Sequence, residues 1–378
     1  MTEREDRLAL SLIAEPGDPR LRDLLQEHEP GQIVAAARAR TSAFRVSPSW
    51  VERARDLRSA VEAARARART RGLRWLCPGD ATWPNALSDL DHLEPLHGTT
   101  GSPVGLWIRG RGNLAELCNQ AVAVVGAREC TTYGAEAASE LAADCADAGF
   151  TIISGAAFGV DGCAHRGAFL MNKPTVGVLA SGADVDYPAG HSALIAEVAA
   201  AGLVVSEQAP GSRPLKGRFL SRNRIIAALS QGTVVIEAAV RSGSLNTLNW
   251  ADQLGRPTMA LPGPVTSRQS TGTHEAIRAG KAVLVTSGKS VLEELSGLGS
   301  EASTSDSPAL TEFDRLPAAV RKTLDGLDWS RQQTVAEIAT SVRLTAREVL
   351  SSLELLERRG LVVRMRSGWI LARRADVG

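Results

Sequence analysis

Apolar and polar positions along residues 121–285 follow a repeating order, in which short β-branched runs are separated by helical segments. Between the first two runs, Ala138, Leu141, Ala142 and Cys145 recur at helical spacing, so they mark the apolar stripe of a helix. Strands that alternate with helices form βαβ units, whose strands are parallel. The pattern therefore predicts a parallel sheet with strands at residues 122–125, 151–153, 175–179, 203–205, 234–236, 258–261 and 282–285.

The first 71 residues predict a small helical module. Apolar spacing places helices at residues 8–13, 20–26, 33–40 and 50–69, with breaks at Pro16-Gly17 and Pro30-Gly31. Residues 72–118 carry prolines between apolar anchors such as Trp75 and Trp107, and we interpret them as an irregular segment that packs over the next domain. Residues 72–296 then form one extended Rossmann-like domain.

The carboxyl-terminal part predicts a separate module. Residues 297–311 are small, polar and acidic, which is typical of a linker. Residues 312–378 contain three helical stripes and then two strand-like runs, at residues 361–365 and 369–372. This order predicts a winged helix. The predicted fold class is thus α/β, an extended Rossmann-like parallel sheet flanked by an N-terminal helical module and a C-terminal winged-helix module.

Composition narrows the class of protein. A hydrophobic fraction of 44% and a charged fraction of 22% are typical of globular proteins. No apolar run is long enough to cross a membrane and the first residues do not form a signal peptide, so we expect a cytoplasmic protein without a membrane partner. The five cysteines include no Cys-x-x-Cys pair, which argues against a metal site and a disulfide framework and favours buried free thiols.

The net charge of +1 hides a concentrated basic stretch. Phosphate binding usually relies on clustered cations, so their distribution matters more than their total. Residues 253–274 lack acidic side chains and carry Arg256 and Arg268. No carboxylate lies between Glu207 and Glu237, and this interval contains Arg213, Lys216, Arg218, Arg222 and Arg224.

Glycine-rich turns follow several of the predicted strands, at Gly126-Ala127-Arg128, at residues 154–161, at Ser181-Gly182 and at residues 241–244. Such turns bring backbone N–H groups and helix amino termini to one edge of a parallel sheet, where anions bind. Each glycine could also serve only to close a tight turn. The first turn does not match the dinucleotide pattern Gly-x-Gly-x-x-Gly, and its arginine suits a phosphate.

Residues 216–226 combine cations with an aromatic side chain. Cations bind phosphates, Asn223 can bond a base edge or the backbone, and Phe219 offers a face on which a base can stack. The alternative for Phe219 is a place in the core beside Ile225 and Ile226. One of the two arginines Arg222 and Arg224 is expected to hold a neighbouring carboxylate such as Glu237.

Six motifs in this order resemble the DNA-processing protein A (DprA, Smf) family. They are Gly126-Ala127-Arg128 with Tyr133-Gly134, SGAAFGVDGCAH at residues 154–165, VLASGADVDYP at 178–188, SEQAPG at 206–211, FLSRNRIIAALS at 219–230 and VVIEAAVRSGSLNT at 234–247. The resemblance covers residues 72–290. It departs from the family at Leu220, where proline is usual, and at His191, where asparagine is common.

The resemblance implies a single-stranded DNA-binding protein that protects incoming DNA and helps to load the RecA recombinase during natural transformation. It also implies that Arg128, Lys216 and Phe219 contact DNA, and that the chain forms a homodimer through its Rossmann-like domains. Together with the turns, it gives these candidate DNA-binding residues: Gly126, Arg128, Gly155, Gly159, Lys216, Phe219, Arg222, Asn223, Arg224, Ser242, Gly243 and Ser244.

Two other classes of function remain as alternatives. A nucleotide-processing enzyme with a related core, such as a phosphoribohydrolase, would use Asp161, His165 or Glu237 as acid or base. A sequence-specific repressor would read duplex DNA through the third helix of the last module, which carries only Arg343 and Arg347 near its start. No nucleophile lies in a recognised motif, so we expect no enzyme activity, no cofactor and no metal.

Overall fold

The computed structural model describes residues 2–39, 44, 46–296, 316–328 and 331–372. The chain divides into two compact units, Met1–Ser300 and Glu301–Gly378. Within the described residues no helix is long and apolar enough to cross a membrane. All five cysteines are free thiols, and Cys77 and Cys145 are buried.

A nine-stranded sheet forms the centre of the first unit, in the order β1-β2-β6-β5-β4-β3-β7-β8-β9. Its seven consecutive strands from β3 onward are parallel, which confirms the predicted α/β class. Each lies at a predicted run: β3 (Ala121–Val125), β4 (Thr151–Ser154), β5 (Thr175–Val178), β6 (Leu203–Ser206), β7 (Gly232–Val235), β8 (Thr258–Ala260) and β9 (Val283–Leu284).

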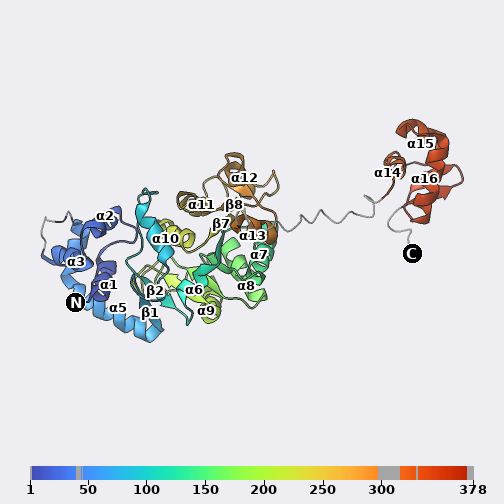
Figure 1. Cartoon of the computed structure of the whole chain (residues 1–378). Coiled ribbons are helices and arrows are strands. Elements are labelled where there is room, and N and C mark those ends of the chain that lie inside the picture. Colours follow the sequence, from blue (N-terminus) through green and yellow to red (C-terminus); the bar gives the residue numbers. More distant parts are fainter. Residues whose placement is uncertain (1, 40–43, 45, 297–315, 329–330, 373–378) are drawn as a thin grey trace. The chain divides into compact units, whose positions relative to one another are not determined.

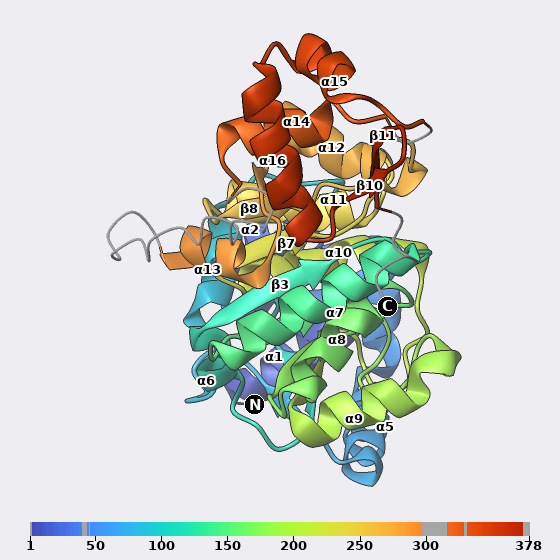
Figure 2. The ribbon, with the colours of Figure 1, turned by 90° about the vertical axis from the view of Figure 1, so that its right-hand side faces the viewer.

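Helices cover both faces of the sheet because side chains alternate along each strand. In β3, Val122 and Val124 pack against α7 (Thr132–Asp147), α8 (Val160–Leu170) and α13 (Gly288–Ser296). Ala123 and Val125 face the other layer, with α10 (Lys216–Ala228), α11 (Ser244–Gln253) and α12 (Thr271–Arg278). Figure 2 shows α7 and α8 on one side of β3, with α10 and α11 on the other. Helices α6 (Leu114–Asn119) and α9 (Ser192–Ala201) also pack against the sheet.

The segment 72–118 is not irregular throughout, contrary to the prediction. It contributes β1 (Leu73–Leu76) and β2 (Leu106–Arg109), which extend the sheet as antiparallel strands beside β6. Trp75 and Trp107 pair across the two strands, with ring centroids 4.9 Å apart. The runs are short and lie among prolines, so their strand pattern is weak, and pairing with the sheet decides their conformation.

The N-terminal helices lie beside the sheet (Figure 1). Their own core surrounds Trp50, and Ala64 and Ala68 pack against Trp107 of the sheet. The predicted helix at 50–69 is divided by a short 3₁₀ turn, Ala54–Asp56. The helices are α1 (Glu3–Ile13), α2 (Pro19–Glu27), α3 (Pro30–Ala39), α4 (Pro48–Arg53) and α5 (Leu57–Arg71).

The described residues of the second unit, 316–328 and 331–372, form three helices and an antiparallel hairpin at the predicted residues. Its core includes Ile338, Val349, Leu353 and Trp369. The elements are α14 (Ala318–Asp325), α15 (Val335–Val342), α16 (Ala346–Arg358), β10 (Val362–Met365) and β11 (Gly368–Leu371). Assignment to the winged-helix class stays a prediction, and the predicted linker at 297–311 lies outside the described residues.

Candidate nucleic-acid interface

A hollow of about 230 Å³ opens where the turns after β3, β4 and β7 meet the first turns of α10 and α11. The carboxyl ends of these adjacent parallel strands lie at one edge of the sheet, which is where ligands of open α/β folds bind. Eight of the predicted site residues line this hollow: Gly126, Arg128, Phe219, Arg222, Asn223, Ser242, Gly243 and Ser244. We refer to it as the Phe219 hollow.

Arg128 and Phe219 form the centre of this site. The guanidinium carbon of Arg128 lies 4.5 Å from the centre of the Phe219 ring. The centres of the Tyr187 and Phe219 rings are 5.8 Å apart. Phe219 is half-buried and stands outside the buried core clusters of the described residues, whereas Ile225 and Ile226 belong to one. The geometry therefore favours a role for Phe219 in binding over a role in the core.

Lys216 is exposed at the first position of α10. In the described part of the chain its ammonium group has no hydrogen bond or ion pair. The amino terminus of a helix carries free backbone N–H groups and the positive end of the helix dipole, both of which attract anions. Lys216 does not line the Phe219 hollow itself, but it adds charge next to it on the same helix as Phe219.

Arg222 is buried and holds the sheet edge together. Its guanidinium donates to the carbonyl of Gly155 at 2.9 Å and to that of Val178. Burial lowers the pKa of Arg222 to about 10, and the Asp161 carboxylate opposes this shift. A Cβ at Gly155 would overlap the guanidinium, so the glycine makes room for it. Arg222 lines the hollow but is mainly a bracing residue.

Asn223 positions the turn before α11. Its amide donates to the Gly243 carbonyl at 3.1 Å and to Asn246 Oδ1 at 3.2 Å. The hydroxyls of Ser242 and Ser244 lie 2.7 Å apart beside Gly243, where no atom occupies the space of a Cβ. The Asn223 amide therefore holds this turn in place, and Ser242, Gly243 and Ser244 line the hollow.

The prediction that Arg224 contacts DNA is corrected by the structure. The side chain is fully buried and forms a bidentate ion pair with Glu207, at 2.7 and 2.8 Å. Its Nε donates to the carbonyl of Gly101. The expected carboxylate partner Glu237 instead accepts from the backbone N–H and the hydroxyl of Thr131.

Gly126 and Gly159 allow close packing of two loops. A Cβ at Gly126 would lie 2.6 Å from Val160, and one at Gly159 would overlap the carbonyl of Ala127. Gly159 also has φ +78°, which favours glycine. Both residues hold the Arg128 loop against the amino terminus of α8 and need not contact a ligand.

The residues considered as acid or base in an enzyme are engaged in the fold. Asp161 is buried and accepts from the Gly155 N–H, and burial raises the pKa of its carboxyl group. His165 is completely buried with Nδ1 2.7 Å from the Thr175 hydroxyl, and burial lowers its pKa to about 3. Both side chains thus bond to neighbouring parts of the fold, Asp161 to the loop after β4 and His165 to the start of β5.

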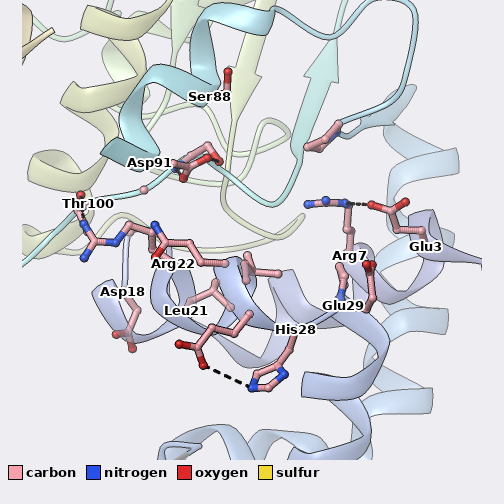
Figure 3. A pocket seen from close by; sticks show the side chains of 18 of the residues that line it. Glu3, Arg7, Asp18, Leu21, Arg22, His28, Glu29, Ser88, Asp91 and Thr100 are labelled. Carbon is pink, nitrogen blue, oxygen red and sulfur yellow. Dashed lines mark hydrogen bonds and ion pairs between the residues drawn. The ribbon is translucent and has the colours of Figure 1, made fainter. Parts of the chain in front are cut away.

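A larger hollow of about 720 Å³ lies between the N-terminal helices and residues 83–102 (Figure 3). Its cations are Arg7, which bonds Glu3, and Arg22, which bonds Asp23 and the Leu93 carbonyl. Carboxylates outnumber them: Glu3, Asp18, Glu27, Glu29, Asp91 and Glu207. This surplus of negative charge disfavours a phosphate backbone, so the larger hollow is not the better DNA site.

The sequence did not single out Tyr187, Arg241 or Arg268 as site residues. Tyr187 is 42% exposed and lies against Phe219, although it belongs to a loop far away in the sequence. Arg241 and Arg268 line a neighbouring hollow that also contains Arg128. The positions of Arg241 and Arg268 in the loops that follow β7 and β8 were the available signal, since these loops begin at the carboxyl edge of the sheet.

Comparison with known proteins identifies the family. The family model of DNA recombination-mediator protein A matches residues 74–296. The chain belongs to this family. A putative DNA processing protein DprA of Mycobacterium tuberculosis is 40% identical over 305 residues, which cover 80% of this chain and 78% of the relative.

Two solved structures of DprA proteins share the fold. The X-ray structure from Streptococcus pneumoniae matches with a TM-score of 0.64 and 31% identity, covering 78% of this chain and 98% of that one. A structure from Helicobacter pylori, described as showing a single-stranded DNA binding mode, matches with a TM-score of 0.50 and 28% identity. It covers 59% of this chain and 95% of that one. The DprA/Smf resemblance inferred from the six motifs is thereby confirmed.

Proposed function

We propose that this chain binds single-stranded DNA at the Phe219 hollow, acts in the cytoplasm, and delivers the DNA to RecA in natural transformation or recombination. The observation that carries the DNA site is the cation–π contact of Arg128 with Phe219 at the carboxyl edge of the sheet, next to the exposed Lys216. The single-strand binding described for the H. pylori DprA protein supports the proposal.

The chemistry of the hollow matches a flexible strand. An aromatic ring offers stacking to any base, and cations around it bind the backbone phosphates, so the site needs no particular sequence. A duplex keeps its bases stacked inside, where Phe219 cannot reach them without unpairing. We therefore expect a preference for single strands over duplex DNA.

The test is a titration of labelled oligothymidine and of a duplex of equal length at several salt concentrations. We expect tighter binding of the single strand and a steep loss of affinity with salt, because binding releases counterions. Arg128→Ala should weaken binding and Arg111→Ala should not. Arg111 is also exposed, without a side-chain partner among the described residues, but it follows β2 near the amino end of β6. Equal affinity for duplex, or a flat salt response, would refute the proposal.

Homodimer formation and RecA loading are part of the same proposal. The edge strand β9 leaves Val283 47% and Leu284 49% exposed, and an apolar sheet edge is a natural place for pairing with a second copy. Sedimentation at micromolar concentration should show a dimer, and Val283→Lys should shift it toward monomer. RecA filament assembly on the bound DNA should start sooner when the protein is present.

We propose no catalytic step. Asp161, His165 and Glu237 each bond to a neighbouring part of the fold, to Gly155, Thr175 and Thr131 respectively. Incubation with nucleotides and with DNA, followed by product analysis, tests this part separately from binding.

A further inference from the structure

Next to the Phe219 hollow lies a second hollow of about 590 Å³, which we call the arginine groove. Its cations are Arg128, Arg241 and Arg268. Arg128 follows β3, Arg241 follows β7 and Arg268 follows β8, and these three strands are consecutive in the sheet. The structure thus places one arginine beyond the carboxyl end of each of three neighbouring strands.

The three arginines differ from those buried nearby. The guanidinium groups of Arg222 and Arg224 donate hydrogen bonds to carbonyls and to a carboxylate inside the fold. Arg128, Arg241 and Arg268 are exposed, and in the described part of the chain none of their guanidinium groups has a carboxylate partner or a hydrogen bond. Glu129 is the one carboxylate among the described lining residues, and it is also exposed.

Three unpaired like charges around one depression repel one another, and bound anions relieve this repulsion. Guanidinium groups bind phosphate oxygens with paired donors, so the natural anion is a phosphate. Neighbouring strands are about 4.8 Å apart, so the row from β3 to β8 spans about 10 Å. This length suits successive phosphates of one strand better than a single phosphate group.

The arginine groove is continuous with the Phe219 hollow, since Arg128 and Ser242 line both. Its loops are held in place by bonds that do not involve the three guanidinium groups. The Gln269 amide donates to the Glu129 carbonyl at 2.8 Å, and the Thr271 hydroxyl donates to the Arg268 carbonyl at 2.7 Å. The cations are therefore carried on a scaffold that is fixed before any ligand binds.

We propose that the DNA strand leaving the Phe219 hollow runs across the carboxyl ends of β3, β7 and β8. Arg241 and Arg268 bind the backbone phosphates that follow the one on Arg128. This inference rests on the proposed single-strand binding and adds the path that the strand takes beyond the Phe219 hollow. It also makes Arg241 and Arg268 binding residues whose contribution depends on the length of the strand.

The experiment compares the full chain with Arg241→Ala, Arg268→Ala and the double variant. Each is titrated with oligothymidines of about 4 and about 16 nucleotides, the range of site sizes known for single-strand binding folds. Each single variant should bind the long strand about tenfold more weakly, as expected for a lost charge-assisted contact. The slope of log affinity against log salt should fall by about 0.7 for each lost phosphate contact. The short strand should bind almost as well as it does to the unchanged protein.

Two matched controls accompany these variants. Arg111→Ala removes an exposed arginine near the amino end of β6 and should leave both affinities unchanged. Glu129→Gln removes the opposing charge from the groove and should tighten binding of the long strand only. Sedimentation of each variant checks that its oligomeric state is unchanged, so that a loss of affinity reports the groove.

The outcomes separate this inference from the proposed function. If the unchanged protein binds the long strand and Phe219→Ala weakens it, single-strand binding stands. Unchanged affinity in the Arg241 and Arg268 variants, or an equal loss for both lengths, would then overturn the strand path alone. Competition by pyrophosphate that needs Arg241 and Arg268, without any effect of these residues on DNA, would make the groove a site for a free phosphate compound. Failure of the unchanged protein to bind DNA would overturn both proposals.

Discussion

The central guanidinium carbon of Arg128 lies over the Phe219 ring, 4.5 Å from the ring centre. A cation over a ring face is an attractive contact, which keeps the two side chains together before a ligand arrives. One face of Phe219 is therefore occupied by the cation, and a base must enter from the side of the ring that remains accessible. The same contact places a phosphate-binding group next to a stacking group.

Phe219→Ala should weaken binding of single-stranded DNA by about 1 to 3 kcal/mol, because base stacking on an aromatic ring contributes that much. Its midpoint of thermal unfolding should change little, since Phe219 is half-buried and outside the core clusters of the described residues. Ile225→Ala is the matched comparison, because Ile225 is buried and its truncation should cost about 2 to 5 kcal/mol of stability. Anisotropy and thermal melting measure the two effects. A large drop in melting temperature with unchanged affinity would instead place Phe219 in the core.

Arg224→Met should lower the free energy of unfolding by about 3 to 5 kcal/mol, because Glu207 would stay buried without its partner. The variant Arg224→Met with Glu207→Leu should regain much of this loss, since it removes both buried charges. Urea unfolding of the two variants measures the difference. If Arg224→Met alone unfolded like the unchanged protein but bound DNA poorly, the residue would belong to the interface after all.

The stability of the fold should decrease as the pH falls below about 6.5, in part because of His165. Burial depresses the folded-state pKa of this imidazole from 6.5 to about 3. Between these values the unfolded chain binds a proton that the folded chain does not, so His165 weakens the fold by up to about 1.4 kcal/mol per pH unit. Buried Asp161 acts in the opposite direction, because its pKa is raised.

Comparison with His165→Gln isolates the histidine from the aspartate. Chemical unfolding at about pH 7 and about pH 5 should show a smaller loss of stability in the variant than in the unchanged protein. Identical losses in the two proteins would mean that His165 is protonated in the fold. The absolute stability of the variant does not enter this comparison.

A chain shortened at Gly297 should retain most of its affinity for single strands, because every residue assigned to the Phe219 hollow and the arginine groove precedes this point. The carboxyl-terminal residues form a separate compact unit with its own core. Titration of the shortened and the full chain with the same oligonucleotide measures this. A hundredfold loss in a shortened chain that still melts cooperatively would assign the last unit to the DNA site.

The sequence predicted the elements whose conformation is set by nearby residues in the chain. The seven parallel strands were found because β-branched runs between helical stripes have few alternatives, and the turns after β3 and β7 located the hollow. β1 and β2 were missed because their four residues each form strands only by pairing with the sheet. One of Arg222 and Arg224 was expected to hold a carboxylate such as Glu237, whereas Arg224 pairs with Glu207. Both carboxylates follow strands, and only tertiary packing distinguishes them. Tyr187 and Arg268 were also missed, because only tertiary packing brings them close to Phe219 and Arg128.

The contact between Arg67 of α5 and Asp184 has a consequence for protein engineering. The Asp184 side chain is completely buried, and besides Arg67 it accepts from the Gly211 N–H at 2.8 Å. A minimal DNA-binding fragment that starts after α5 would lack Arg67 and would expose the Asp184 carboxylate. The loop that carries Asp184 and Tyr187 would then lose its ion pair with the N-terminal helices. Trimming the chain for crystallisation or for use as a reagent should therefore begin at the carboxyl-terminal end and leave the first helices in place.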